Sequence, residues 1–241
     1  MGEDASDSSS DQLPLQLNND SPVQLVFDLP VREAFDRDDF FVSPSNEHAV
    51  QMIDLWPDWP SKTLFIVGPA GCGKSHLAEV WRSRSGAQIH LAAEITASGL
   101  PDLEAGSCHV IEDIDRGQLD ETALFHLLNL GKEYDLDLMI TAKSLPGTWD
   151  IKLPDLRSRL RSIPYVSIES PDDLLLRATL VKLFSDRQLE ISPEIVNYLA
   201  LHIDRTMSAV REAVEKLDRT ALAKKRRITR NLVREILKPD N

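Results

Sequence analysis

The residues best suited to chemistry form one loop that follows the phosphate-binding pattern G-x-x-x-x-G-K-S: Gly68, Pro69, Ala70, Gly71, Cys72, Gly73, Lys74 and Ser75. The glycines allow the backbone to curl so that successive N–H groups face an anion. Lys74 would then reach the terminal phosphates of a nucleotide, and the Ser75 hydroxyl would bind Mg²⁺. The loop therefore predicts a site for an adenine nucleotide, ADP or ATP, with Mg²⁺.

The segments on either side of the loop are the elements that must position it. The apolar run 63–67 predicts a buried strand before the loop, and residues 76–81 show a helical pattern after it. That helix would direct its N-terminal N–H groups and partial positive charge at the bound phosphate. Cys72 lies inside the loop, where we interpret it as a tolerated small residue rather than a redox group.

Two acidic residues, Glu112 and Asp113, follow the apolar run 108–111. In P-loop enzymes the first acid of such a pair holds Mg²⁺ through water, and the second polarises the attacking water. The usual order is Asp then Glu, so the inverted order predicts weak hydrolysis by this chain. The alternative is that one of these acids only ends the strand.

A further strand at 137–141 ends in Thr141. Thr141 either contacts the γ-phosphate or its water, or it is a plain strand end.

Hydrophobic periodicity divides the chain into an α/β domain at 25–169 and a helical domain at 170–241. The first contains further short strands at 88–91 and 165–168 and a helix at 120–134. Before the loop, Phe41 and Val42 begin a turn and helix that would wrap the adenine or simply pack. The second domain consists of amphipathic helices, two of which start with a capping residue followed by Pro and an acid.

Composition and charge narrow the class of protein. The 241 residues carry a net charge of -12, which counts against broad nucleic-acid affinity. The sequence predicts no membrane span and no signal peptide. The two cysteines do not suggest a disulfide framework and favour a reducing, cytoplasmic setting. A basic run at 216–230 is interpreted as a solvated helix end, with a partner contact as the alternative.

Residues 1–24 are rich in Ser, Asp, Asn and Gln, which predicts a disordered tail. One island breaks this composition, formed by Gln12, Leu13, Leu15 and Leu17 around a proline that favours an extended backbone. An extended peptide with apolar side chains on one face suits a groove on a partner. Alternatively, the leucines cover this chain's own core. The segment 12–17 resembles the Q-x-L-x-L peptide that docks bacterial proteins on the sliding clamp.

The order of these motifs resembles that of AAA+ ATPases: P-loop, acidic strand end, strand-end Thr, the segment Leu-Arg-Ser-Arg-Leu and a helical lid. Residues 41–46 resemble the start of the ATPase module of the bacterial initiator DnaA, and residues 156–160 resemble its arginine-finger segment. Residues 203–205, 216–219 and 228–237 resemble the Hda family of DnaA-homologous regulators. The resemblance extends over about residues 12–238.

The resemblance implies an α/β AAA+ P-loop fold with a five-stranded parallel sheet and a small helical lid. It also implies a function in bacteria at the replisome and nucleoid. The protein would dock on the β sliding clamp of DNA polymerase III through residues 12–17, engage DnaA and promote hydrolysis of its ATP. Arg159 would be the arginine finger, with a surface ion pair as the alternative. A homo-oligomer remains open.

Two departures from the pattern bear on catalysis. The lid arginine that senses nucleotide in DnaA falls at Ser208. Either flanking arginine, Arg205 or Arg211, could substitute for it, and of the two we assign the nucleotide contact to Arg205. With the inverted acids, this predicts a weak ATPase that uses nucleotide mainly as a conformational ligand. We expect no dedicated DNA-binding domain. The alternatives are a stand-alone AAA+ loader or remodelling ATPase, a small-molecule P-loop kinase and a DNA-binding initiator variant.

Overall fold

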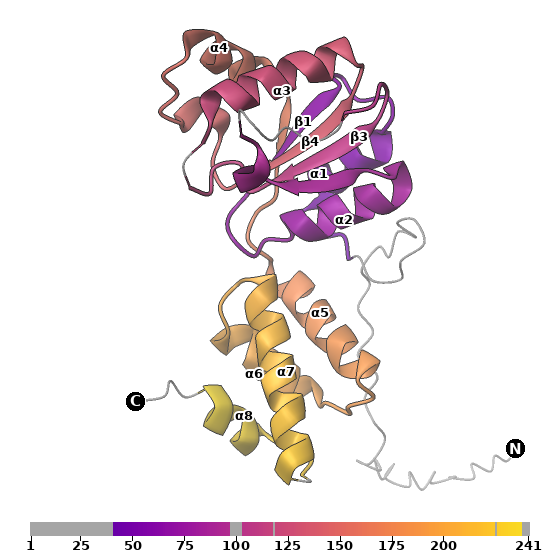
Figure 1. Ribbon diagram of the computed structural model, residues 1–241. Coiled ribbons are helices and arrows are strands. Elements are labelled where there is room, and N and C mark those ends of the chain that lie inside the picture. The colour runs from indigo at the N-terminus through magenta and orange to yellow at the C-terminus, as the bar shows by residue number, and fades with distance from the viewer. Residues whose placement is uncertain (1–40, 97–102, 118, 225, 238–241) are drawn as a thin grey trace, which may run out of the picture.

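The computed structural model describes residues 41–96, 103–117, 119–224 and 226–237, and the predicted clamp-binding peptide at 12–17 lies outside these ranges. Figure 1 shows an α/β unit joined to a separate group of helices by the segment after β5. Within the described ranges, no helix is both long and apolar enough to cross a membrane.

The α/β unit is built on a parallel sheet, and its strands in the described residues have the order β2-β3-β4-β1-β5. The strands are β1 (Thr63–Val67), β2 (Gln88–Leu91), β3 (Cys108–Glu112), β4 (Asp137–Ala142) and β5 (Tyr165–Ser167). The predicted five-stranded parallel sheet is therefore confirmed. Because β1, β3 and β4 are neighbours and parallel, their carboxyl ends meet at one edge of the sheet.

Alternating side chains of the strands face two hydrophobic cores, as the two-residue period of a strand requires. Phe65, Ile111 and Ile140 face the core under α3 (Glu121–Glu133) and α4 (Pro154–Ser162). Leu64 and Met139 face the opposite core, under α1 (Glu47–Leu55) and α2 (Lys74–Ser85). Short 3₁₀ turns, η1 (Ala92–Glu94) and η2 (Pro146–Thr148), lie in the connections. The sheet is thus covered by helices on both faces, which leaves its edges and strand ends for function.

Local signals explain where the helices begin and end. The Asp120 carboxylate accepts a hydrogen bond from the Ala123 N–H at 2.9 Å and so caps α3. Asp172 caps the first lid helix in the same way through the Leu175 N–H at 2.7 Å. Helix α2 ends at Gly86, whose φ of 71° is the left-handed conformation typical of a residue that stops a helix.

The helical lid contains α5 (Asp173–Asp186), α6 (Pro193–His202), α7 (Met207–Lys224) and α8 (Arg230–Leu237). It has a core of its own, in which Leu180, Phe184, Leu199, Val214 and Val233 are completely buried. The predicted helical lid is therefore confirmed. Figure 1 shows that α7 begins close to the α/β unit and leads away from it.

Candidate nucleotide-binding site

The P-loop connects β1 directly to α2. Gly71 and Gly73 have φ values of 74° and 115°, which allow the tight curl before the helix. Lys74 is the first residue of α2, and its ammonium donates hydrogen bonds to the carbonyl oxygens of Gly68 at 2.8 Å and Pro69 at 3.1 Å. These bonds hold a nearly buried charge across the mouth of the loop, where a phosphate would bind.

The lid contacts the P-loop at Gly71. The Met207 N–H, at the start of α7, donates a hydrogen bond to the Gly71 carbonyl at 2.8 Å. A Cβ atom on Gly71 would lie 2.7 Å from the Cβ of Thr206, so a larger residue would push the lid away from the loop. The loop and the start of α7 therefore form one surface.

A cavity of about 340 Å³ lies at this junction, and we call it the phosphate pocket. It is lined by the loop, the end of β3, the residue after β4 and the start of α7. The lining residues are Ala70, Gly71, Gly73, Lys74, Ser75, His76, Asp113, Arg116, Lys143, Met207, Ser208 and Arg211. Lys143, Arg116 and Arg211 were not assigned to the site from the sequence. The parallel register of β1, β3 and β4 is the signal that could have suggested Lys143.

The two predicted catalytic residues Asp113 and Thr141 differ in their relation to the phosphate pocket. Asp113 lines the phosphate pocket, and its carboxylate lies 3.4 Å from the Arg116 guanidinium. Thr141 is only 1% exposed, and its hydroxyl accepts a hydrogen bond from the Asp113 N–H at 2.9 Å. It is absent from the described lining of the phosphate pocket, so its contact here is with the backbone of the β3 end. This position favours the alternative interpretation of Thr141 as a strand-end residue.

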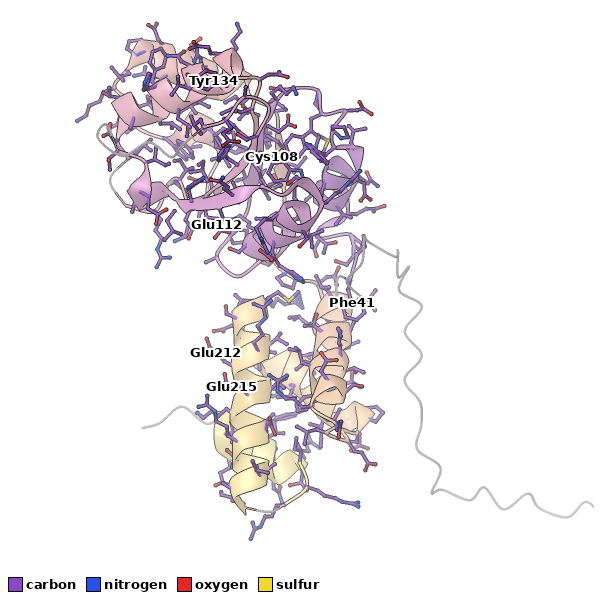
Figure 2. The ribbon with its side chains drawn as sticks, turned by 45° about the vertical axis from the view of Figure 1, so that its right-hand side comes forward. Phe41, Cys108, Glu112, Tyr134, Glu212 and Glu215 are labelled. Carbon is purple, nitrogen blue, oxygen red and sulfur yellow. The ribbon has the colours of Figure 1, made fainter. Side chains whose placement is uncertain are left out.

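The two predicted Mg²⁺ ligands differ in their relation to the phosphate pocket. Ser75 lines the phosphate pocket, whereas Glu112 is not among its described lining residues. The Oε1 atom of Glu112 is buried and has no hydrogen-bond partner among the described residues. Figure 2 labels Glu112 at the side of the α/β unit that faces the lid. Mg²⁺ usually binds one or two carboxylates together with the phosphates. Asp113, the carboxylate that does line the pocket, already pairs with Arg116. The residues present therefore do not fit the predicted metal site.

A second cavity of about 190 Å³, the base pocket, lies between the α/β unit and α5. Phe41 lines it, and Figure 2 shows this side chain at the start of the lid. The Asn46 side chain holds the turn: its Nδ2 donates to the Phe41 carbonyl at 2.9 Å, and its Oδ1 accepts from the Ser43 N–H at 2.8 Å. Val42 instead packs into the core under α1 and α2. Phe41 is therefore placed to contact a base, and Val42 supports the turn from below.

The lid arginine at this site is Arg211. It lines both the phosphate pocket and the base pocket, and Ser208 lines the phosphate pocket. Arg205 lines neither pocket among the described residues, because its guanidinium pairs with the Asp173 carboxylate. The assignment of the nucleotide contact to Arg205 is thus not supported by its position. Arg211 lies on α7, the helix whose first residue, Met207, contacts the P-loop.

Cys72 lies in the P-loop with its side chain buried in the core under α1 and α2. Burial raises the pKa of its thiol, and the nearby Lys74 ammonium lowers it by a smaller amount. Cys72 and Cys108 are both free thiols. The neutral, buried thiol agrees with the interpretation of Cys72 as a small residue of the loop.

Arg159 lies on α4, and neither nucleotide pocket includes it among the described residues. Its guanidinium lies over the Phe125 ring, 5.0 Å from the ring centre, and donates a hydrogen bond to the Asn129 side-chain oxygen. Both partners are on α3, one turn apart. Arg157 is different, because its guanidinium donates to the Ile151 carbonyl before the same helix. Arg159 is therefore half-buried against α3, outside the described lining of both pockets.

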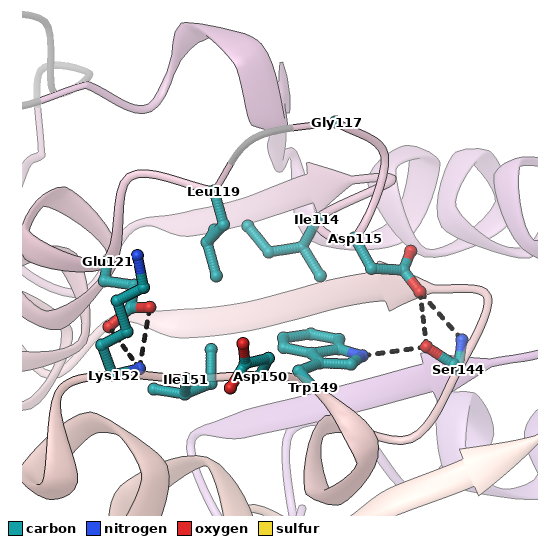
Figure 3. A pocket seen from close by; sticks show the side chains of 10 residues that line it. All are labelled: Ile114, Asp115, Gly117, Leu119, Glu121, Ser144, Trp149, Asp150, Ile151 and Lys152. Carbon is teal, nitrogen blue, oxygen red and sulfur yellow. Dashed lines mark hydrogen bonds between the residues drawn. The ribbon is translucent and has the colours of Figure 1, made fainter.

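Hydrogen bonds tie the phosphate pocket to the start of α4. The Asp115 carboxylate accepts from the N–H groups of Lys143 and Ser144 at 2.9 to 3.0 Å, and the Trp149 indole N–H donates to the Ser144 hydroxyl at 3.0 Å. At the far end, the Glu121 carboxylate accepts from the Lys152 N–H at 2.9 Å. These backbone hydrogen bonds lower the Glu121 pKa. Figure 3 shows both groups around a cavity of about 390 Å³. The hydrogen bonds at its two ends thus connect the phosphate pocket to the start of α4.

The parallel sheet, the P-loop and the helical lid define the class: the chain has the fold of a AAA+ P-loop protein. Among solved structures, it is similar to domain III of the replication initiation protein DnaA of Thermotoga maritima, with a TM-score of 0.68 and 19% identity. That match covers 84% of this chain and 96% of the other. The Thermotoga maritima branch migration motor RuvB gives a TM-score of 0.65 at 16% identity, covering 80% of this chain and 67% of RuvB.

The lid gives the more specific assignment. Residues 173–237 match the family model described as Hda, lid domain. An uncharacterized protein of Haemophilus influenzae is 28% identical over 191 residues, which cover 72% of this chain and 80% of that protein. The chain thus joins a lid that matches the Hda lid family to an α/β unit with the fold of DnaA domain III.

Proposed function

We propose that the protein is a regulator of replication initiation that binds an adenine nucleotide, docks on the sliding clamp and promotes hydrolysis of DnaA-bound ATP. The Hda-type lid and the DnaA-like fold support this function. A DnaA structure bound to AMPPCP and single-stranded DNA is similar to this chain with a TM-score of 0.61 and 14% identity over 77% of the chain. The match covers 66% of that DnaA chain, and the bound AMPPCP supports nucleotide binding at the two pockets described above.

The observation that carries the proposal is the position of Arg159. A residue that stabilises charge on a transferring phosphoryl group must approach the nucleotide directly. Arg159 lies on the α3–α4 surface and outside the described lining of both nucleotide pockets. We therefore assign it to a nucleotide held by a neighbouring subunit. Arginine suits this task because its guanidinium stays charged and matches the geometry of phosphate oxygens.

The protein's own nucleotide serves mainly as a conformational ligand in this mechanism. Lys74 and the P-loop backbone bind the phosphates, Phe41 contacts the base, and Arg211 joins both to the lid. The Asp113 carboxylate pairs with Arg116 at 3.4 Å, so it is directed at this guanidinium rather than at an attacking water. Slow hydrolysis at this site would keep the lid on the loop while Arg159 acts on the partner.

The decisive experiment measures hydrolysis of ATP bound to DnaA in the presence of clamp loaded on DNA. The parent protein should accelerate it, and Arg159→Ala should lose on the order of 10³-fold of that acceleration while still binding nucleotide. Arg161→Ala, a surface change on the same helix, is the matched control. If Arg159→Ala stimulates DnaA as well as the parent does, the proposed mechanism is wrong. Steady turnover by the protein alone would instead support a stand-alone ATPase.

Docking on the clamp is proposed for residues 12–17. A double change of Leu15 and Leu17 to Ala removes the two apolar side chains furthest along the alternating peptide. It should abolish retention on immobilised clamp without altering thermal unfolding. The same change should also remove the clamp-dependent stimulation of DnaA. Undiminished retention of the double variant would assign clamp binding to another surface.

A further inference from the structure

The phosphate pocket is unusually rich in cations for a site expected to hold a metal ion. Four basic side chains line it, supplied by four different parts of the chain: Lys74, Arg116, Lys143 and Arg211. Asp113 is the acidic residue among the described lining, and Arg116 lies 3.4 Å from its carboxylate. The remaining three cations are available to an anion, so the pocket has a net positive charge before any metal binds.

Lys143 has a position that follows from the sheet register. Val67 and Ala142 are paired neighbours on β1 and β4, and the Gly68 N–H donates to the Ala142 carbonyl at 3.1 Å. The first residue after β4 therefore lies beside the first residue of the P-loop. The Asp115 carboxylate fixes the Lys143 backbone through its N–H, which leaves the side chain to line the pocket. Lys143 thus faces the phosphates from β4, while Lys74 does so from α2.

The acidic side of the pocket is weak by comparison. Glu112, the acid expected to hold Mg²⁺, is outside the described lining and has a buried Oε1 atom. No group of three or more His, Cys, Asp or Glu side chains suited to a metal ion occurs in the described parts of the chain. Cations that replace a metal give the phosphates the same kind of charge stabilisation without requiring carboxylate ligands.

We infer that Lys143 supplies the charge that Mg²⁺ would otherwise supply at the terminal phosphate, so that nucleotide binding does not require the metal. This inference rests on the proposed nucleotide binding and adds to it the identity of the compensating group. Because Lys143 lines the phosphate pocket and is not among the described lining of the base pocket, its contribution is expected to be larger for ATP than for ADP.

Calorimetric titration with ATP and ADP, in excess Mg²⁺ and in excess EDTA, tests the inference directly. For the parent protein, removal of Mg²⁺ should change either Kd by less than about threefold. In EDTA, Lys143→Met should weaken ATP binding about tenfold, as expected for loss of one charge-assisted contact, and ADP binding less. Lys143→Arg, which keeps the charge, should bind ATP as the parent does. Excess Mg²⁺ should restore part of the affinity that Lys143→Met loses.

Lys152→Met is the matched control, because Lys152 lies on the same connection after β4 but lines a different cavity. It should leave both Kd values unchanged, and thermal unfolding without nucleotide should be the same for all variants. Binding of nucleotide by the parent only when Mg²⁺ is present would overturn the inference and leave the nucleotide site intact. Parent-like ATP binding by Lys143→Met in EDTA would also overturn it. Absence of binding to the parent in both solutions would instead reject the nucleotide site itself.

Discussion

The phosphate pocket and the Arg159 surface, to which the proposed function assigns phosphate contacts, are built by different means. The phosphate pocket relies on backbone groups and on glycine conformations that the lid locks in place. The Arg159 surface relies on side chains alone, with one guanidinium resting on an aromatic ring and an amide of α3. The first arrangement forms a cavity, whereas the second lies outside the described lining of both pockets. The proposed function assigns the chain's own nucleotide to the first region and a partner's nucleotide to the second.

The two regions should respond separately to mutation if this comparison is correct. The largest separation is expected from Lys74→Ala, which removes a nearly buried ammonium from the P-loop. Nucleotide affinity should fall on the order of 100-fold, because the loop loses its main phosphate contact. Calorimetry measures this, and an unchanged Kd for both ADP and ATP would remove the P-loop from the binding site.

A smaller effect, specific to the contact between loop and lid, is expected from Gly71→Ala. The added Cβ would meet Thr206, and the residue has a φ of 74°. Gly106 has the same φ with open space around it, so Gly106→Ala is a control that carries the strain without the clash. Gly71→Ala should weaken nucleotide binding about tenfold more than Gly106→Ala does. Equal effects of the two changes would mean that the lid contact does not contribute to binding.

A change at the Arg159 surface should have the opposite effect: it should lower stimulation of DnaA and leave nucleotide binding unchanged. Asn129→Ala removes the oxygen that accepts a hydrogen bond from Arg159 and should reduce stimulation of DnaA about fivefold, within the range for the loss of one typical hydrogen bond. Nucleotide affinity should stay the same. Lys132→Ala, an exposed change on the same helix, is the control. A loss of nucleotide binding in Asn129→Ala would show that the two regions are not independent.

The smallest expected effect concerns the stability of the sheet, which supports both regions. His109 on β3 is completely buried, and burial, with the nearby His90, lowers its pKa to about 4. In the unfolded chain the pKa returns towards 6.5, so the unfolded state binds the proton first as the pH falls. The free energy of unfolding should therefore decrease from pH 6.5 towards pH 4, by roughly 1 kcal/mol at pH 5.5.

Urea unfolding at pH 7 and pH 5.5 measures this change. His109→Gln should flatten the dependence on pH, although the variant starts from a lower stability because the hydrogen bonds to His90 and Ser107 change. His202→Gln, at an exposed site on α6, should behave as the parent does. A parent protein with equal stability at the two pH values would contradict the lowered pKa of His109.

Most of the fold followed from local patterns in the sequence. The strand 63–67, the helix after the loop and the lid helices were predicted from apolar periodicity, and the parallel sheet came from the resemblance to AAA+ proteins. The functional residues that local patterns missed all depend on distant elements. Lys143 reaches the pocket through strand pairing, and Arg211, rather than Arg205, does so because Asp173 holds Arg205 on α5. Spacing along the chain cannot show which cation a distant acid will hold.

The hydrogen bond from Met207 to Gly71 has a mechanical consequence. It attaches the start of helix α7 to the P-loop, where the phosphates are proposed to bind. Helix α7 has 18 residues and is therefore about 27 Å long, so a tilt of about 10° at the loop moves its far end by about 5 Å. Figure 1 shows α8 lying beside that far end. A movement of the loop on nucleotide binding would thereby be amplified into a larger displacement at the far end of α7.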